Sequence, residues 1–245
     1  MHPSTMNEAF GQLRALLNAP ELAPPDDLFA LLRHANELDT ERYAEGWLPY
    51  LMDHDLPLFI ARSFEDMDEL CQLLPRLERV GFEMNDHAFE DGAIDALVQH
   101  VHASRICSLE LKRSEISYLG ARRLALHGSL SNLEHLDLCG NPIEYTGLTA
   151  IAQSPFFSKL HVLRLDRCAL IGPGVESLAR SPYITQLQEL SLADNLDLST
   201  PSLLALLRSP VLSNLRVLHL GRLLSDELRR VIERAPHLTK LESLE

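Results

Sequence analysis

The chain has 245 residues, of which 46% are hydrophobic and 23% charged, a composition typical of a soluble globular protein with a large apolar core. Its formal net charge of −13 argues against nucleic acid and anionic membrane surfaces as partners, because both are bound through lysine and arginine. The cysteines show no paired spacing, the first residues do not resemble a signal peptide, and no apolar stretch is long enough to span a membrane. We therefore expect a cytoplasmic protein with reduced thiols.

Residues 7–54 carry helical periodicity. Apolar side chains recur three and four residues apart in two runs, 10–17 and 28–32, which prolines separate. A third apolar stretch surrounds Trp47, the only tryptophan. We interpret residues 1–56 as an α-helical N-terminal cap that shields the first strand; a separate recognition module is the alternative.

Residues 57–245 are predicted to form one repeat domain. It opens with a degenerate unit, in which Leu58-Phe59-Ile60-Ala61 reads as a strand and 66–74 as a short helix. A weak unit follows at Leu77, with apolar residues spaced as in the later repeats. The domain is thus expected to hold about six repeats, which start near 77, 106, 133, 160, 187 and 215.

The central feature of the chain is an apolar phrase, L-x-x-L-x-L, that recurs at a nearly fixed spacing. The phrases begin at Ile106, Leu133, Leu160, Leu187 and Leu215, with gaps of 27, 27, 27 and 28 residues. A fixed period of this length marks a stacked-repeat architecture. Within each phrase apolar residues alternate with polar ones, which predicts a strand with one buried face.

Each predicted strand is followed by a turn and a helix. The turn positions hold Ser114, Asn141, Cys168 and Asn195. We expect these side chains to bond the free backbone groups of the adjacent coil and to tie successive coils together.

The predicted helices end at Ser-Pro pairs, because proline cannot continue a helix. These pairs are Ser154-Pro155, Ser181-Pro182 and Ser209-Pro210. The pattern degrades at the C-terminus, where Leu223 takes the turn position and Leu238-x-x-Leu241-x-Ser243 predicts only a short closing strand.

These residues resemble the leucine-rich repeat family, L-x-x-L-x-L-x-x-N/C-x-L, and the length and helical second half of each unit resemble its ribonuclease-inhibitor-like class. The likeness covers about residues 106–228. It implies an α/β solenoid, a right-handed horseshoe or arc with parallel strands on the concave face and helices on the convex face. The family commonly docks its partners on the concave face, and some of its bacterial members carry a helical segment before the repeats.

The polar strand positions between and beside the buried leucines define the candidate partner-binding site. They are Glu110, Lys112, Arg113, His135, Asp137, Arg164, Asp166, Arg167, Glu189 and His219. Because neighbouring strands lie about 4.8 Å apart, Glu110, Asp137 and Arg164 are expected to lie side by side. The alternative is a set of solvated charges that neutralise one another across strands, each pair contributing roughly 0.2–1 kcal/mol.

A metal site is a further alternative. His135, Asp137 and Cys139 alternate on one strand, with His161 on the next coil, and zinc accepts these ligand types. However, side chains two apart on a strand point in parallel directions, and Arg164 would repel a cation. We therefore predict neither a metal site nor a cofactor.

No catalytic motif is present: G-x-S-x-G, H-E-x-x-H and the Walker lysine loop are all missing. Gly172-Pro173-Gly174 occupies the recurrent turn position, and Cys168 is expected to be buried and inert. Cys139 would need an adjacent base to act as a nucleophile. We predict that the chain is not an enzyme.

Two functional classes follow from these observations. The first is a non-catalytic protein–protein interaction module, namely a scaffold, adaptor or inhibitor that binds a protein partner on the concave strands. The alternative is a regulator of an enzyme such as a small-GTPase-activating protein, which some ribonuclease-inhibitor-like repeat proteins resemble. The sequence sets neither the partner's identity nor the oligomeric state.

Overall fold

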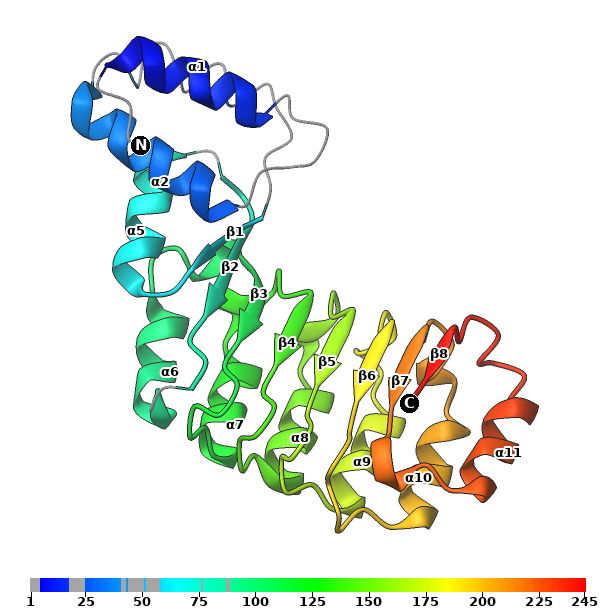
Figure 1. Ribbon diagram of the computed structural model, residues 1–245. Coiled ribbons are helices and arrows are strands. Elements are labelled where there is room, and N and C mark those ends of the chain that lie inside the picture. The colour runs from blue at the N-terminus through cyan, green and yellow to red at the C-terminus, as the bar shows by residue number, and fades with distance from the viewer. Residues whose placement is uncertain are drawn as a thin grey trace. The chain divides into compact units, whose positions relative to one another are not determined.

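The computed structural model describes residues 5–17, 25–40, 43, 51, 58–75, 77–86 and 89–245. The chain divides into two compact units, Met1–Phe82 and Glu83–Glu245 (Figure 1). Trp47, most of the stretch around it and the domain boundary predicted at residues 56 and 57 lie outside the described residues.

The first unit combines helices with a pair of parallel strands. Its elements are α1 (Met6–Leu17), α2 (Pro25–Leu38), β1 (Phe59–Ala61), α5 (Phe64–Leu73) and β2 (Val80–Glu83). Helices α1 and α2 match the two helical runs predicted from the sequence, and each buries one apolar stripe. The Tyr43 hydroxyl donates to the carbonyl of Leu73, 3.0 Å away, and satisfies one of the free carbonyls at the end of α5.

The second unit repeats one strand and one helix. Its strands are β3 (Ile106–Glu110), β4 (His135–Asp137), β5 (Val162–Arg164), β6 (Glu189–Ser191), β7 (Val217–His219) and β8 (Ser243–Leu244). Its helices are α6 (Glu90–Gln99), α7 (Tyr118–Leu126), α8 (Glu144–Ala152), α9 (Gly172–Ala179), α10 (Thr200–Leu207) and α11 (Asp226–Arg234).

The strands of this second unit lie in chain order, and all are parallel to their neighbours. The helices pack against each other in the same order on the opposite side of the coils (Figure 1). The architecture is therefore an α/β repeat solenoid, in agreement with the predicted strand, turn and helix. Among the described residues, no helix is both long and apolar enough to cross a bilayer.

The core of the second unit is built from the leucines of the repeated phrase. The middle leucines are partners in strand register and are fully buried: Leu109, Leu136, Leu163, Leu190 and Leu218. Every coil thus contributes the same apolar layer, and stacking buries both of its sides.

Asparagine side chains at the turn position connect successive coils, as predicted. The Asn141 side-chain oxygen accepts hydrogen bonds from the backbone N–H groups of Ser114 and Ile116, at 2.9 and 3.0 Å. Its amide nitrogen donates to the carbonyls of Leu111 and Leu138, at 2.6 and 2.8 Å. Asn195 makes the same four bonds one pair of coils further on.

The serines of the Ser-Pro pairs also join neighbouring coils. Each hydroxyl donates to a carbonyl near the end of the helix in the preceding coil, with Ser154 bonded to Ala125 of α7 and Ser181 bonded to Ala152 of α8. Pro155 and Pro210 begin short 3₁₀ turns, because proline at the first helical position loses no hydrogen bond. The Ser-Pro pair thus ends one helix and starts the next connection.

The C-terminal coil departs from the repeat where the sequence departs from it. Leu223 lies in a 3₁₀ turn, Gly221–Leu223, at the point where earlier coils carry serine, asparagine or cysteine. The last strand, β8, is two residues long and pairs with β7. The sequence predicted a short strand here from a phrase beginning at Leu238, whereas the pairing of Leu218 with Leu244 makes Leu241 the equivalent of Leu215 and so the first leucine of the last phrase.

Candidate functional site

Strand pairing in the second unit aligns the predicted site residues in rows across the sheet. Glu110 pairs with Asp137 and Asp137 pairs with Arg164, so the three lie side by side on β3, β4 and β5. The row continues with Ser191 and His219. The row two residues earlier on each strand consists of Ser108, His135, Val162, Glu189 and Val217.

Asp137 is the buried centre of these rows, with 1% of its surface exposed. Its Oδ1 accepts a hydrogen bond from the backbone N–H of Cys139, at 3.0 Å. Its Oδ2 has no hydrogen-bond donor among the described residues, but Lys112 Nζ lies 3.5 Å away and Arg164 Nη1 lies 3.8 Å away. A buried carboxylate is costly unless its charge is compensated, and these two cations compensate it.

Lys112 joins Asp137 to Glu110. Its ammonium lies 2.8 Å from Glu110 Oε2 and donates a hydrogen bond to it. Burial alone would lower the pKa of Lys112, but the hydrogen bond to Glu110 and the charges of both carboxylates raise it. Burial would likewise raise the pKa of Glu110, and the bond from Lys112 together with nearby positive charge lowers it. Both groups therefore stay ionised near neutral pH.

Arg164 connects the same carboxylate to the next strand. Its Nε donates to Glu189 Oε1 at 2.6 Å, and this bond is the main reason that the pKa of Arg164 is raised. His135 lies close by, with Nε2 4.0 Å from Glu110 Oε1 and without a hydrogen-bond partner in the described part of the chain. Burial and the charge of Arg164 lower the pKa of His135, so its neutral form is favoured.

Six residues thus form one connected group, which we call the charge cluster: Glu110, Lys112, His135, Asp137, Arg164 and Glu189. With His135 neutral, three carboxylates face two cations, which leaves one net negative charge. The charges neutralise one another across strands, as the alternative interpretation expected, and they also fix each other's positions.

Both carboxylate oxygens of Asp166 contact residues of the neighbouring coils. Its Oδ1 accepts hydrogen bonds from the Ser191 hydroxyl and from the backbone N–H of Ala193, the latter at 2.7 Å. Its Oδ2 lies 3.6 Å from the Cys139 thiol. Among the predicted site residues, Asp166 therefore has a clear structural task.

Arg113 and Arg167 lie in a row at the ends of the strands, where the backbone adopts positive φ. The row repeats every 27 residues and comprises Asp86, Arg113, Gly140, Arg167, Asp194 and Gly221, with φ between 50 and 75°. Arg113 pairs with Asp86 through two nitrogens, and Arg167 Nε lies 3.0 Å from Asp194 Oδ2. The two arginine side chains are 64% and 74% exposed. A hollow of about 480 Å³ is lined by both arginines and by Gly140.

His219 lies in the same row as Asp137 but near the last strand. Its Nδ1 is 3.3 Å from Glu245 Oε2, and its side chain is partly buried. It is a register neighbour of Ser191 and does not contact the charge cluster through any described ion pair. The ten predicted residues therefore fall into the charge cluster, the strand-end arginines, Asp166 and His219.

The thiols near this face are held in protonated form. Burial, followed by the charge of Asp137, raises the pKa of Cys139 far above its ordinary value. Burial raises the pKa of Cys168 to about 12, and its Sγ lies 3.1 Å from the carbonyl of Leu138. Within the described ranges, no group of three or more His, Cys, Asp or Glu residues could hold a metal ion.

Two further rows of polar residues were not predicted from the sequence. One row lies immediately before the first leucine of each phrase, and the other lies immediately after it. The first comprises Asn132, Lys159, Gln186, Asn214 and Lys240. The second comprises Glu134, His161, Gln188, Arg216 and Glu242, whose backbones are bonded in succession. The signal that could have found them is the alternation of polar, leucine and polar residues at the start of every phrase.

We compared the chain with family models, curated proteins and solved structures. No family model matches the chain, and no curated protein matches it. Among solved structures, one chain of the crystal structure of the Rad7 and Elc1 complex in yeast matches 98% of this chain over 75% of its own length. The sequence identity is 14% and the TM-score 0.42.

The class of the protein follows from its own repeated geometry. Parallel strands alternate with helices, leucines form the stacked core, and asparagines bond successive coils. These features define an α/β repeat solenoid with a leucine-rich-repeat-like fold.

Proposed function

We propose that this chain is a non-catalytic protein-interaction module, a scaffold, adaptor or inhibitor that binds a protein partner on the strand face of its second unit. The observation that carries the proposal is the charge cluster. It presents charges of both signs on adjacent strands, and ion pairs and hydrogen bonds hold them in place. A patterned surface of this kind suits a partner with its own fixed pattern of charges.

The rigidity of the face supports the same proposal. The rows are set by backbone pairing rather than by loops, so a partner orders few side chains when it binds. Less ordering leaves more of the contact energy for affinity.

Several finer features belong to this proposal. We propose that the strand face is the concave side of a right-handed arc and that the repeats are of the ribonuclease-inhibitor-like kind, as their length of 27 to 28 residues suggests. We further propose that residues 1–56 act as a helical cap and that the protein is cytoplasmic.

The test uses partners captured from the native cell. The immobilised full chain is incubated with lysate, and bound proteins are identified by mass spectrometry. Arg113→Glu with Arg167→Glu should abolish capture of the specific partner, because these exposed arginines lie at the strand ends beside the charge cluster, where a partner bound to the strand face would contact them. Thermal unfolding should change little, since exposed ion pairs contribute only about 0–1 kcal/mol each.

The matched control is Arg122→Glu with Arg180→Glu. Both arginines are exposed on the helical side, and this variant changes the net charge by the same amount. It should capture the partner as well as the parent chain does. A partner that is lost equally from both variants, or retained by both, would place the contact elsewhere or show that only net charge matters.

The alternative function, a small-GTPase-activating protein, has its own direct test. The full chain is added to purified small GTPases, and GTP hydrolysis is measured. We expect no acceleration. A rate increase that depends on the strand face would replace the scaffold proposal.

A further inference from the structure

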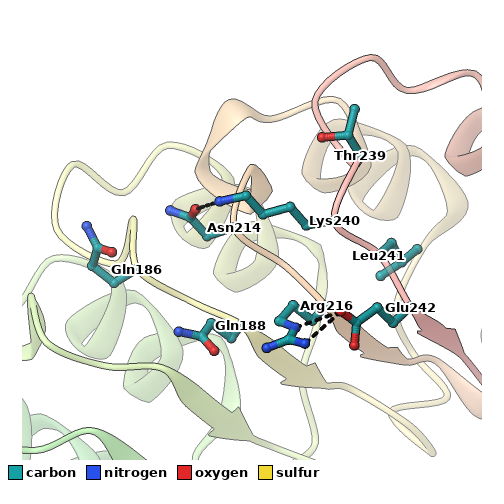
Figure 2. A pocket seen from close by; sticks show the side chains of 8 residues that line it. All are labelled: Gln186, Gln188, Asn214, Arg216, Thr239, Lys240, Leu241 and Glu242. Carbon is teal, nitrogen blue, oxygen red and sulfur yellow. Dashed lines mark hydrogen bonds and ion pairs between the residues drawn. The ribbon is translucent and has the colours of Figure 1, made fainter.

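A polar hollow of about 460 Å³ lies at the coil segments that precede β6, β7 and β8 (Figure 2). Six of its eight lining residues belong to the two polar rows on either side of the first leucine of each phrase. Its lining consists of Gln186, Gln188, Asn214, Arg216, Thr239, Lys240, Leu241 and Glu242. These residues come from three successive coils, so stacking alone creates the site.

Lysine is rare in this protein, and one of its lysines lines the hollow. The chain has three lysines, and two of them repeat one arrangement. Lys159 Nζ donates to Asn132 Oδ1 at 2.6 Å, and Lys240 Nζ donates to Asn214 Oδ1 at 2.7 Å. Neither ammonium has a carboxylate partner among the described residues, in a chain of net charge −13.

Asn214 itself is anchored to the preceding coil. Its amide nitrogen donates to the carbonyl of Thr185 at 2.9 Å, which leaves its oxygen for Lys240. The ammonium is therefore positioned by a neutral group that does not cancel its charge. Two of its three N–H groups remain available to a ligand.

The remaining lining supplies further donors. The amides of Gln186 and Gln188 are exposed and have no hydrogen-bond partner in the described part of the chain. Arg216 donates from Nε and Nη2 to the same oxygen of Glu242, at 3.0 and 2.7 Å, so this pair is neutral (Figure 2). The hollow therefore carries one net positive charge, from Lys240, beside two free amides.

We propose that this hollow binds an acidic side chain of an extended peptide segment in a protein partner. Lys240 pairs with the carboxylate, because a charge-assisted hydrogen bond is stronger than one between neutral groups. The amides of Gln186 and Gln188 offer both a donor and an acceptor, the pair that a peptide backbone requires. Leu241 provides the only apolar side chain in the lining, for the methylene groups of the bound residue.

The charges of the site favour a carboxylate over a phosphate. Glu242 lies in the lining and would repel a dianion, whereas one carboxylate matches the single uncompensated charge of Lys240. The hollow lies on the segments before the strands and shares no residue with the charge cluster. This proposal and the proposed function can therefore fail independently.

The test measures binding of two short peptides to the full chain by NMR. The probes are acetyl-Ala-Glu-Ala-amide and its neutral isostere acetyl-Ala-Gln-Ala-amide. The acidic peptide should shift the side-chain amide signals of Gln186 and Gln188 saturably and bind about tenfold more tightly than the isostere, which corresponds to about 1.4 kcal/mol. Lys240→Gln should reduce its affinity to that of the isostere.

The matched control is Lys159→Gln, which loses the same charge and the same bond to asparagine but lies outside the hollow. This variant should bind the acidic peptide like the parent chain. Equal affinity for both peptides, full binding by Lys240→Gln, or no saturable shift would each overturn the proposal. Displacement of the acidic peptide by inorganic phosphate more readily than by acetate would also overturn it, in favour of a phosphate site.

Discussion

At the scale of single residues, Asp137 decides how the candidate face is organised. Its side chain is buried, its Oδ1 holds the strand backbone, and its Oδ2 attracts Lys112 and Arg164 from opposite sides. Both cations also bind a second carboxylate, so one buried charge orders four others. Such networks stabilise a fold only when every member keeps its partner.

The first residue-scale prediction concerns Asp137→Asn. The new amide would direct N–H donors toward two cations, so we expect the free energy of unfolding in urea to fall by about 1–3 kcal/mol. Asp197→Asn, at an exposed position, serves as the control and should change stability by less than about 0.5 kcal/mol. Equal effects of the two substitutions would show that Asp137 is not the centre of the network.

A second prediction at this scale concerns pH. The folded-state pKa of His135 lies below its ordinary value of 6.5. The neutral imidazole therefore makes its full contribution to the free energy of unfolding above that pH. The contribution is lost as pH falls through 6.5 toward the lowered folded pKa, because protonation then favours the unfolded chain. The groups that face His135 are Glu110, Asp137, Arg164 and Glu189.

The measurement compares the parent chain with His135→Gln between about pH 7.5 and pH 5, by denaturant unfolding. The parent chain should lose more stability over this interval than the variant, which has no imidazole to protonate. Parallel curves for the two proteins would contradict the lowered pKa of His135.

At the scale of elements, the turn asparagines are what join one coil to the next. Asn141 makes four hydrogen bonds to backbone groups of its own and the preceding coil, and all are buried. Ser154 and Ser181 do the same at the helical end of the coil with one hydroxyl each. Each coil is thus tied at both ends of its apolar layer.

Asn141→Ala should lower the free energy of unfolding by about 2–4 kcal/mol, because it leaves buried N–H and carbonyl groups without partners. Asn132→Ala is the matched control. That asparagine lies in the same coil, but its bonds to Ser104 and Lys159 are at the exposed surface. Its loss should cost less than about 1 kcal/mol. A comparable loss in both variants would argue against the role given to the turn asparagines.

At the scale of the whole molecule, the repeated phrase predicted the strand–turn–helix unit, the buried leucines and the asparagine bonds. These follow from local periodicity, which the sequence displays directly. The periodicity could not predict that Asp166 would accept hydrogen bonds from Ser191 and Ala193, because such bonds depend on side-chain geometry between coils. The lysine-containing hollow was also missed, since it is made of three coils whose polar residues look unremarkable one coil at a time.

The row of positive φ at the strand ends has a consequence for how this surface can change. The backbone N–H groups of Arg113, Gly140 and Arg167 donate to the following coil, at 2.9, 2.7 and 3.0 Å. Their side chains take no part in those bonds. An arginine, an aspartate or a glycine can therefore occupy the same position while the ladder of hydrogen bonds stays intact, at a backbone cost of about 1–2 kcal/mol for residues other than glycine. The exposed side chains of this row can therefore be exchanged one at a time, by mutation or by design, while the backbone of the repeat keeps its hydrogen bonds.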